Sequence, residues 1–402
     1  MHKITSIKAK EIKDSRDNPT IEVEVVSGDV VARASVPSGA STGSREAKNV
    51  DAKTAVKNVN EIISSAIKDL EVDPLEIDKI LLKLDGTKDK SKLGANAILG
   101  VSLAITRLGA KLENKPLWKY INKISGLKIK PQLPKLFMNV INGGTHADFR
   151  LPFQEYMIIT GDNKKLGEFY QRAEQFIREL GEAIEEKYGK VKMGDEGGFS
   201  PEMKSLEDPF ELISNLKDRD MPIALDIAAS EFYDGAVYNI LGEEYLSTQL
   251  EQIYKDLVEE FDIVSIEDPY DENDLDSFKK ITAESKNWNL KSTDKELLIV
   301  GDDLTTTNYK SILDSATNKR ANAVIIKPNQ IGTLTEVYNA VKITQGAGWK
   351  IICSHRSGET EDTFISDLAV GIGAYGIKSG SPLQKERRVK YERLLEIEGE
   401  MA

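Results

Sequence analysis

The first part of the chain alternates apolar and polar positions. Over residues 3–36 this alternation has the period of half-buried β-strands, and Gly28-Asp29 supplies a turn, so an antiparallel sheet is predicted. Residues 51–113 follow a helical period instead, and their longest uncharged stretch, 93–106, is shorter than the ~18 residues of a membrane span and predicts a buried helix. Because its helices follow its strands, the segment 1–125 is predicted to form a small α+β domain.

The pattern changes after a linker-like stretch that contains Gly126, Pro131 and Pro134. Over residues 134–402, short β-branched and apolar runs alternate with amphipathic helical stretches, which predicts an α/β domain with a (β/α)8-type barrel. Six runs each end in one ionisable residue, at intervals of 23 to 41 residues. Barrel enzymes place their active sites at the carboxyl ends of the strands, so these residues are predicted to share one rim. They are Asp226, Glu267, Asp302, Lys327, His355 and Lys378.

Three of the rim residues, Asp226, Glu267 and Asp302, are carboxylates. Oxygen ligands without His or Cys suit a hard cation, and Mg²⁺ fits best. A single acid at a strand end is more often solvated or caps the next helix, but three on successive strands favour a metal site. Lys327 and Lys378 are candidate general bases if neighbouring cations lower their pKa values; the alternative is two lysines that extend to the surface.

Two glycine-rich segments of the barrel region carry further acids. NGGTHADFRLPFQE (142–155) and GDEGGFSP (194–201) lack the glycine spacing of nucleotide-binding loops. Glu155 and Glu196 could form a general acid pair, since two adjacent carboxylates raise one another's pKa. The alternative for the second segment is a tight turn with exposed acids.

The segment SHRSGETED (354–362) combines basic and hydroxyl groups at a strand end. Arg356 offers a planar fork of donors and Ser357 a hydroxyl, which together suit a phosphorylated substrate. A charged loop without a ligand explains this segment equally well when it is taken alone.

Composition narrows the partners and the compartment. The chain has 402 residues, with 54 Lys+Arg against 66 Asp+Glu, a formal charge of −12. An acidic chain without a dense basic block repels phosphate backbones, so nucleic-acid binding is disfavoured. The one cysteine, Cys353, allows no intramolecular disulfide, and the N-terminus lacks the apolar region of a signal peptide, so a cytoplasmic protein without a membrane span is expected.

Segments spread over nearly the whole chain resemble the enolase family. They are DSRDNPTIEVEV, VPSGASTG, LDGTKDKSKLGANAILGVSLA, NGGTHAD, QEYMI, GDEGGFSP, SIEDP, GDDLTTTN, IIKPNQIGTL and SHRSGETEDTFISDLAVG, in the family's order. The resemblance implies a lyase of glycolysis and gluconeogenesis, with an α+β domain before a barrel. Its reaction is the reversible dehydration of 2-phosphoglycerate to phosphoenolpyruvate through a Mg²⁺-stabilised enolate.

The resemblance also implies a role for each candidate residue. Lys327 would remove the proton next to the substrate carboxylate, and Glu196 with Glu155 would protonate the departing hydroxyl. Two Mg²⁺ ions per active site are implied, the second arriving with substrate. The first would be held by Asp226, Glu267 and Asp302, and the second with the help of Ser41. Arg356 and Ser357 would bind the phosphate of the substrate. The rest of the substrate would contact Lys378, His355, His146, Gln154 and Ser41, and His146 is also expected to be catalytic.

Several features depart from the family pattern. After STGSREA the chain passes quickly into a helix, which predicts a short lid that closes less completely, and the sequence ends at EIEGEMA, so the family's usual C-terminal tail is expected to be missing. The family's dimer contact pairs an acid, here Glu22, with a basic residue that Glu396 replaces, and Asp17 stands at a usual glycine. Two facing carboxylates repel, which puts the usual contact in doubt unless a cation or another residue compensates; a homodimer is still the predicted state.

Two other functions compete with this interpretation. A different lyase or epimerase of the enolase superfamily would keep the carboxylate triad but would not need the phosphate-binding pair Arg356 and Ser357. An enolase-like protein kept for binding, for example through a C-terminal lysine, fits less well because the sequence ends in Met401-Ala402.

Overall fold

The computed structural model describes residues 2–39, 43–147, 151–161, 165–291 and 296–402. Its N-terminal part is a three-stranded antiparallel sheet in the order β1-β2-β3, followed by helices. The predicted turn joins β2 to β3 at Gly28, whose φ of 58° favours glycine. The elements are β1 (Ser6–Lys13), β2 (Pro19–Ser27), β3 (Val30–Ser35), α1 (Ala52–Lys57), η1 (Asn58–Ile63), α2 (Ser64–Ile67), α3 (Pro74–Asp85), α4 (Ala95–Leu112) and α5 (Leu117–Ser125).

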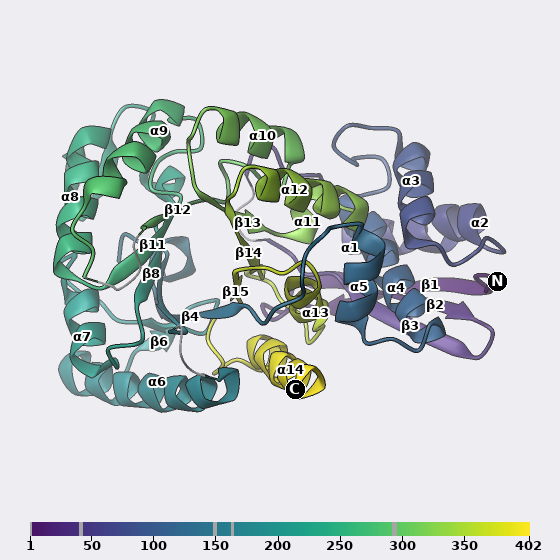
Figure 1. The fold of residues 1–402 in the computed structure, drawn as a ribbon, viewed down its shortest axis with the longest axis horizontal. Coiled ribbons are helices and arrows are strands. Elements are labelled where there is room, and N and C mark those ends of the chain that lie inside the picture. The colour runs from purple at the N-terminus through teal and green to yellow at the C-terminus, as the bar shows by residue number, and fades with distance from the viewer. Residues whose placement is uncertain (1, 40–42, 148–150, 162–164, 292–295) are drawn as a thin grey trace.

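Helix α4 confirms the buried helix predicted from the uncharged stretch. It packs on the sheet against β2 and β3, and most of its residues are buried. At Gly100 a Cβ atom would lie 2.6 Å from Val23 Cγ2, so the close approach of helix and sheet requires glycine there. Figure 1 shows this part, in purple and blue, beside the barrel.

The larger part of the chain is a closed eight-stranded barrel, as predicted. Its strands follow the order β4-β5-β8-β11-β12-β13-β14-β15, and β15 pairs with β4 to close the ring. The barrel interior is filled by apolar side chains such as Phe137, Val264 and Ile325. The ring strands are β4 (Lys135–Asn142), β5 (Glu155–Ile159), β8 (Ile223–Asp226), β11 (Ile263–Glu267), β12 (Leu298–Gly301), β13 (Ala323–Ile326), β14 (Lys350–Ser354) and β15 (Gly376–Lys378).

Helices surround this barrel (Figure 1). They are α6 (Leu166–Tyr188), α7 (Asp208–Leu216), α8 (Ser247–Glu260), α9 (Leu275–Glu284), α10 (Tyr309–Thr317), α11 (Pro328–Ile331), α12 (Leu334–Gly346), α13 (Phe364–Gly371) and α14 (Lys385–Met401). Short elements complete the loops: η2 (Gly144–Ala147), β6 (Lys192–Met193), β7 (Phe199–Ser200), η3 (Ala229–Phe232), β9 (Tyr238–Ile240), β10 (Glu243–Tyr245) and η4 (Ser285–Asn287). Among the described residues, no helix has both the length and the apolar character to cross a bilayer.

One strand departs from a regular repeat of strand–helix units. β5 is antiparallel to both of its neighbours, β4 and β8, because the segment between β4 and β5 is too short for a crossover helix. The first residue of β5, Glu155, therefore lies at the same rim as the last residues of the parallel strands. In the strand register Glu155 is directly opposite Asp226.

The N-terminal part reaches this same rim. An isolated antiparallel bridge joins Ser38 to Gly358, and their backbone groups exchange two hydrogen bonds of 2.8 Å. Arg107 of α4 donates two hydrogen bonds to Asp362, at 2.6 and 2.7 Å. Ser38, just after β3, and Arg107 of α4 are therefore held next to the strand ends of the barrel.

Candidate active site

Five of the six strand-end residues line one polar pocket at the carboxyl end of the barrel, and the sixth, Glu267, contacts Lys378 of its lining. Each strand is apolar and buried along its length, so a charged side chain appears only where the strand leaves the barrel. The pocket is lined by Glu46, Gln154, Glu155, Glu196, Asp226, Ala228, Glu231, Asp268, Asp302, Asp303, Lys327, Ser354, His355, Arg356, Ser357 and Lys378.

Lys378 contacts three carboxylates at the centre of this pocket. Its ammonium lies 2.9 Å from Glu155, 2.6 Å from Asp226 and 2.9 Å from Glu267, and all four residues are buried. Burial opposes its charge, but these carboxylates outweigh burial and raise the pKa of Lys378 well above its ordinary value. Gln154 donates a further hydrogen bond of 3.1 Å to Asp226.

Lys327 is paired with Asp302 on the next strand. Burial, the largest influence, lowers the pKa of Lys327, and Arg356 and Lys378 act in the same direction, but the carboxylates led by Asp302, with Glu267, more than offset them and the pKa is raised. The pairing also lowers the pKa of Asp302, although burial opposes this. The neighbouring cations Arg356 and Lys378 do act to lower the pKa of Lys327, the condition set for its role as a base, but with a carboxylate this close they do not decide the direction.

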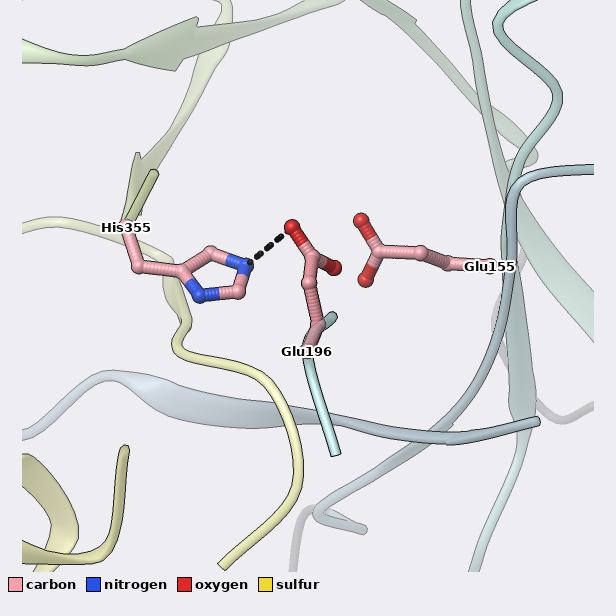
Figure 2. Close-up of side chains that lie close together, drawn as sticks. All are labelled: Glu155, Glu196 and His355. Atoms are coloured by element: carbon pink, nitrogen blue, oxygen red, sulfur yellow. Dashed lines mark ion pairs between the residues drawn. The ribbon is translucent and has the colours of Figure 1, made fainter. Parts of the chain in front are cut away.

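Glu155, Glu196 and His355 form a compact buried group (Figure 2). The Glu196 carboxylate lies between the other two side chains, with its Oε1 3.5 Å from His355 Nε2. Burial and then the charge of Glu196 raise the pKa of Glu155 well above its ordinary value, as expected for an acid pair. Burial lowers the pKa of His355 well below its usual range, so the imidazole is neutral.

Arg356 is occupied by a carboxylate from the N-terminal part. Its Nη1 and Nη2 donate to Glu46 at 3.0 and 3.2 Å, and both side chains are almost fully buried. Glu46 belongs to the STGSREA segment that precedes α1. Ser357 follows Arg356 in the pocket wall. A guanidinium that binds a carboxylate in two places can bind a phosphate in the same way.

Sequence reasoning assigned no role to three residues that shape the pocket. Glu46 holds Arg356, Gln330 donates to Asp302 at 2.9 Å, and Asp268 accepts hydrogen bonds from the backbone N–H groups of Asp302 and Asp303. All three lie inside the motif-rich segments, but periodicity gives no sign of which side chains within a loop point inward. Of the predicted site residues, Ser41 lies outside the described residues, and the side chain of His146 is likewise not described.

The donor groups of the pocket suit a divalent cation. They are carboxylate oxygens, and Oε1 of Glu267 is buried without a hydrogen-bond partner among the described residues. Asp268, Asp302 and Asp303 bring their oxygens within 4.8 Å of one another. Asp226, Glu267 and Asp302 are instead bonded to the two ammonium groups. The pocket therefore contains acidic clusters that can bind a metal ion, and Lys327 and Lys378 offset part of their negative charge.

Comparisons with known proteins match the chain from end to end. The family model described as "Enolase, N-terminal domain" matches residues 4–121, and "Enolase, C-terminal TIM barrel domain" matches residues 130–402. A protein named enolase from Methanopyrus kandleri is 43% identical over 100% of this chain and 97% of its own length. Proteins named enolase from Thermococcus gammatolerans and Solanum lycopersicum are 43% and 42% identical, over 99% and 100% of this chain and 95% and 96% of their own lengths.

Proposed function

Because the chain belongs to the enolase family and is a phosphopyruvate hydratase that dehydrates 2-phosphoglycerate to phosphoenolpyruvate, we propose that the strand-end pocket performs this reaction. The observation that carries the proposal is the burial of acids, lysines, an imidazole and a guanidinium in one pocket. A lysine can supply the base, carboxyl groups can supply the acid and the cation site, and the guanidinium can supply the phosphate site. The imidazole lines the substrate.

The base is Lys327 and the acid is Glu196, assisted by Glu155. β13, which precedes Lys327, lies across the ring from β5, which begins at Glu155, so proton removal and hydroxyl departure take place on opposite sides of the substrate. The raised pKa of Glu155 supports a shared proton in the acid pair. Lys327 acts as a base only in its neutral form, which requires that the charge of Asp302 be balanced by another cation.

Mg²⁺ fits the carboxylates Asp226, Glu267 and Asp302, and a second Mg²⁺ would bind with substrate and Ser41. When bound, Mg²⁺ supplies positive charge that offsets these carboxylates and stabilises the negative charge that develops on the substrate carboxylate. Lys378 adds a fixed positive charge from within the protein.

Substrate orientation comes from the remaining lining groups. Arg356 and Ser357 hold the phosphate once Glu46 has left the guanidinium, while Gln154, His355 and His146 line the rest of the substrate. The 3.0 and 3.2 Å hydrogen bonds between Arg356 and Glu46 support the phosphate role, because a carboxylate already occupies the place of the anionic ligand.

We further propose a cytoplasmic enzyme with two domains, at 1–125 and 134–402, and a small phosphorylated molecule as its partner. The lid is the segment around Ser41. The proposed short lid would let more water reach the substrate and weaken its retention.

A homodimer remains compatible with the residues that argued against it. Within one chain, Glu22 pairs with Lys10 at 2.8 Å and Glu396 with Arg393 at 2.9 Å, so each carboxylate brings its own cation to a contact between copies. Asp17 has a φ of 62°, the left-handed conformation that favours the usual glycine. We propose a homodimer; sedimentation that shows only monomer at micromolar concentration would contradict it.

Turnover of 2-phosphoglycerate tests the proposed function. The absorbance of phosphoenolpyruvate should rise after 2-phosphoglycerate and Mg²⁺ are added and should stop rising when a chelator is added. A folded protein without turnover would contradict the proposal and would favour another acid as substrate.

A further inference from the structure

Arg387 is the bulkiest side chain that is fully buried in the described structure. It lies in the first turn of α14 and is 0% exposed. No ion pair joins its guanidinium to a carboxylate in the part of the chain that the structure describes. Burying an unpaired charge is costly unless hydrogen bonds satisfy it, so its contacts need an explanation. None of the roles proposed above uses this residue.

The guanidinium connects the two segments that carry His355 and Glu196. Of its five acceptors, three belong to the turn that follows β14, one to the residue before Glu196 and one to Gln384, just before α14. The donors reach His355 Nδ1 at 2.5 Å, the backbone oxygen atoms of Arg356 at 2.5 Å, Ser357 at 2.8 Å and Asp195 at 3.3 Å, and Gln384 Oε1 at 3.4 Å.

The contact with His355 determines where the imidazole carries its proton. A guanidinium has only donors, so Nδ1 must present its lone pair to Arg387. The proton of the neutral ring is then on Nε2. This atom is buried, has no hydrogen-bond partner among the described residues, and lies 3.5 Å from Glu196 Oε1 (Figure 2).

We propose that Arg387 is a positioning residue that fixes His355 as the Nε2–H tautomer, with this N–H directed at the Glu196 carboxyl group. A protonated Nε2 cannot accept the proton of Glu196, which therefore stays available for the departing hydroxyl. After that transfer the same N–H can donate to the carboxylate that forms. The inference rests on the proposed role of Glu196 as the acid.

The tautomer can be measured in the resting protein, independently of turnover. The chain has three histidines, so ring ¹⁵N spectra of protein labelled at histidine are simple, and a His355→Gln sample assigns the signals. We expect an unprotonated Nδ1 and a protonated Nε2 at neutral pH. A proton on Nδ1, or on both nitrogens, would overturn the inference, whereas a lack of turnover would bear only on the proposed function.

Arg387→Lys tests whether the arginine is responsible. One ammonium keeps the charge but cannot span the fork of acceptors. We expect the single tautomer to be lost and kcat to fall by roughly tenfold to a hundredfold, with KM little changed. Arg393→Lys is the matched control, because Arg393 lies on the same helix but pairs with Asp367, away from His355; its spectrum and kcat should match the wild type.

Two results would contradict the role of Arg387. One is an unchanged ring spectrum in Arg387→Lys, whatever happens to kcat, because a merely structural residue would lower activity without moving the tautomer. The other is a full further loss of kcat when Arg387→Lys is added to His355→Gln, since residues that act through one another lose little more together. If Arg387→Lys fails to fold, the ring spectrum of the wild type still shows whether His355 is the Nε2–H tautomer.

Discussion

Replacing Lys378 by methionine tests how the pocket balances its charges. The variant keeps the aliphatic stem but removes the ammonium that lies within 2.9 Å of Glu155, Asp226 and Glu267. Removing one partner of a buried ion pair costs about 3–5 kcal/mol. Proton uptake limits this cost, because burial already raises the pKa values of Glu155 and Glu267.

Denaturant titrations with a chelator and with Mg²⁺ measure the effect. In the chelator we expect the free energy of unfolding to fall by about 3–5 kcal/mol. With Mg²⁺ the loss should be smaller, because a cation bound by Asp226 and Glu267 supplies the missing charge and stabilises the folded chain by mass action. Turnover of Lys378→Met with Mg²⁺ should be lost.

Lys217→Met is the matched control for this experiment. Lys217 pairs with Asp262 at 2.9 Å elsewhere in the barrel, and its side chain is only 8% exposed. Its loss of stability should be the same with and without Mg²⁺. The reasoning would be refuted if Lys378→Met also lost the same amount in both conditions, or lost less than the ~1 kcal/mol of an exposed ion pair.

Three further substitutions test other parts of the chain. Lys327→Ala should abolish phosphoenolpyruvate formation with unchanged circular dichroism; retained turnover would exclude Lys327 as the base. Glu46→Gln frees Arg356 from a charge-assisted bond worth about 1.5–3 kcal/mol, so inorganic phosphate should bind roughly tenfold more tightly by calorimetry, and equal affinity would contradict the competition. Burial raises the pKa of Asp78 to about 6, so the folded chain binds this proton more tightly than the unfolded chain and loses stability as the pH rises from about 4 to 6. In urea titrations Asp78→Asn should therefore match the wild type near pH 4 and exceed it by up to ~3 kcal/mol at pH 7.5; a constant difference would contradict this.

The parallel part of the barrel could be predicted because its strands are buried on both faces. Such a strand is a continuous apolar run, and a charge interrupts it only at the rim. This pattern predicted the strand ends correctly: Asp226 and Glu267 are the last residues of β8 and β11, and Asp302 and Lys327 directly follow β12 and β13. The antiparallel sheet of the N-terminal part was predicted for a similar reason, since its alternation has a period of two.

The direction of β5 could not be predicted from periodicity. EYMII is a buried apolar run like the others, and an apolar run reads the same in either direction. Only the short segment after β4 shows that no crossover helix intervenes. This reversal brings Glu155 to the rim at the start of its strand, so the pairing of Glu155 with Glu196 could be suggested from the sequence but not explained by it.

The choice of partners inside the pocket also lies beyond the sequence. Lys327 and Lys378 could each have met another cation, which would lower their pKa values, or a carboxylate, which would raise them. The structure pairs both with carboxylates because a buried acid without a cation costs several kcal/mol, and these are the cations that the neighbouring strands provide. Glu46 and Arg387 also make contacts between distant segments, with Arg356 across 310 positions and with the backbone oxygen of Asp195 across 192 positions. Contacts of this kind can be recognised only when the fold brings the two segments together.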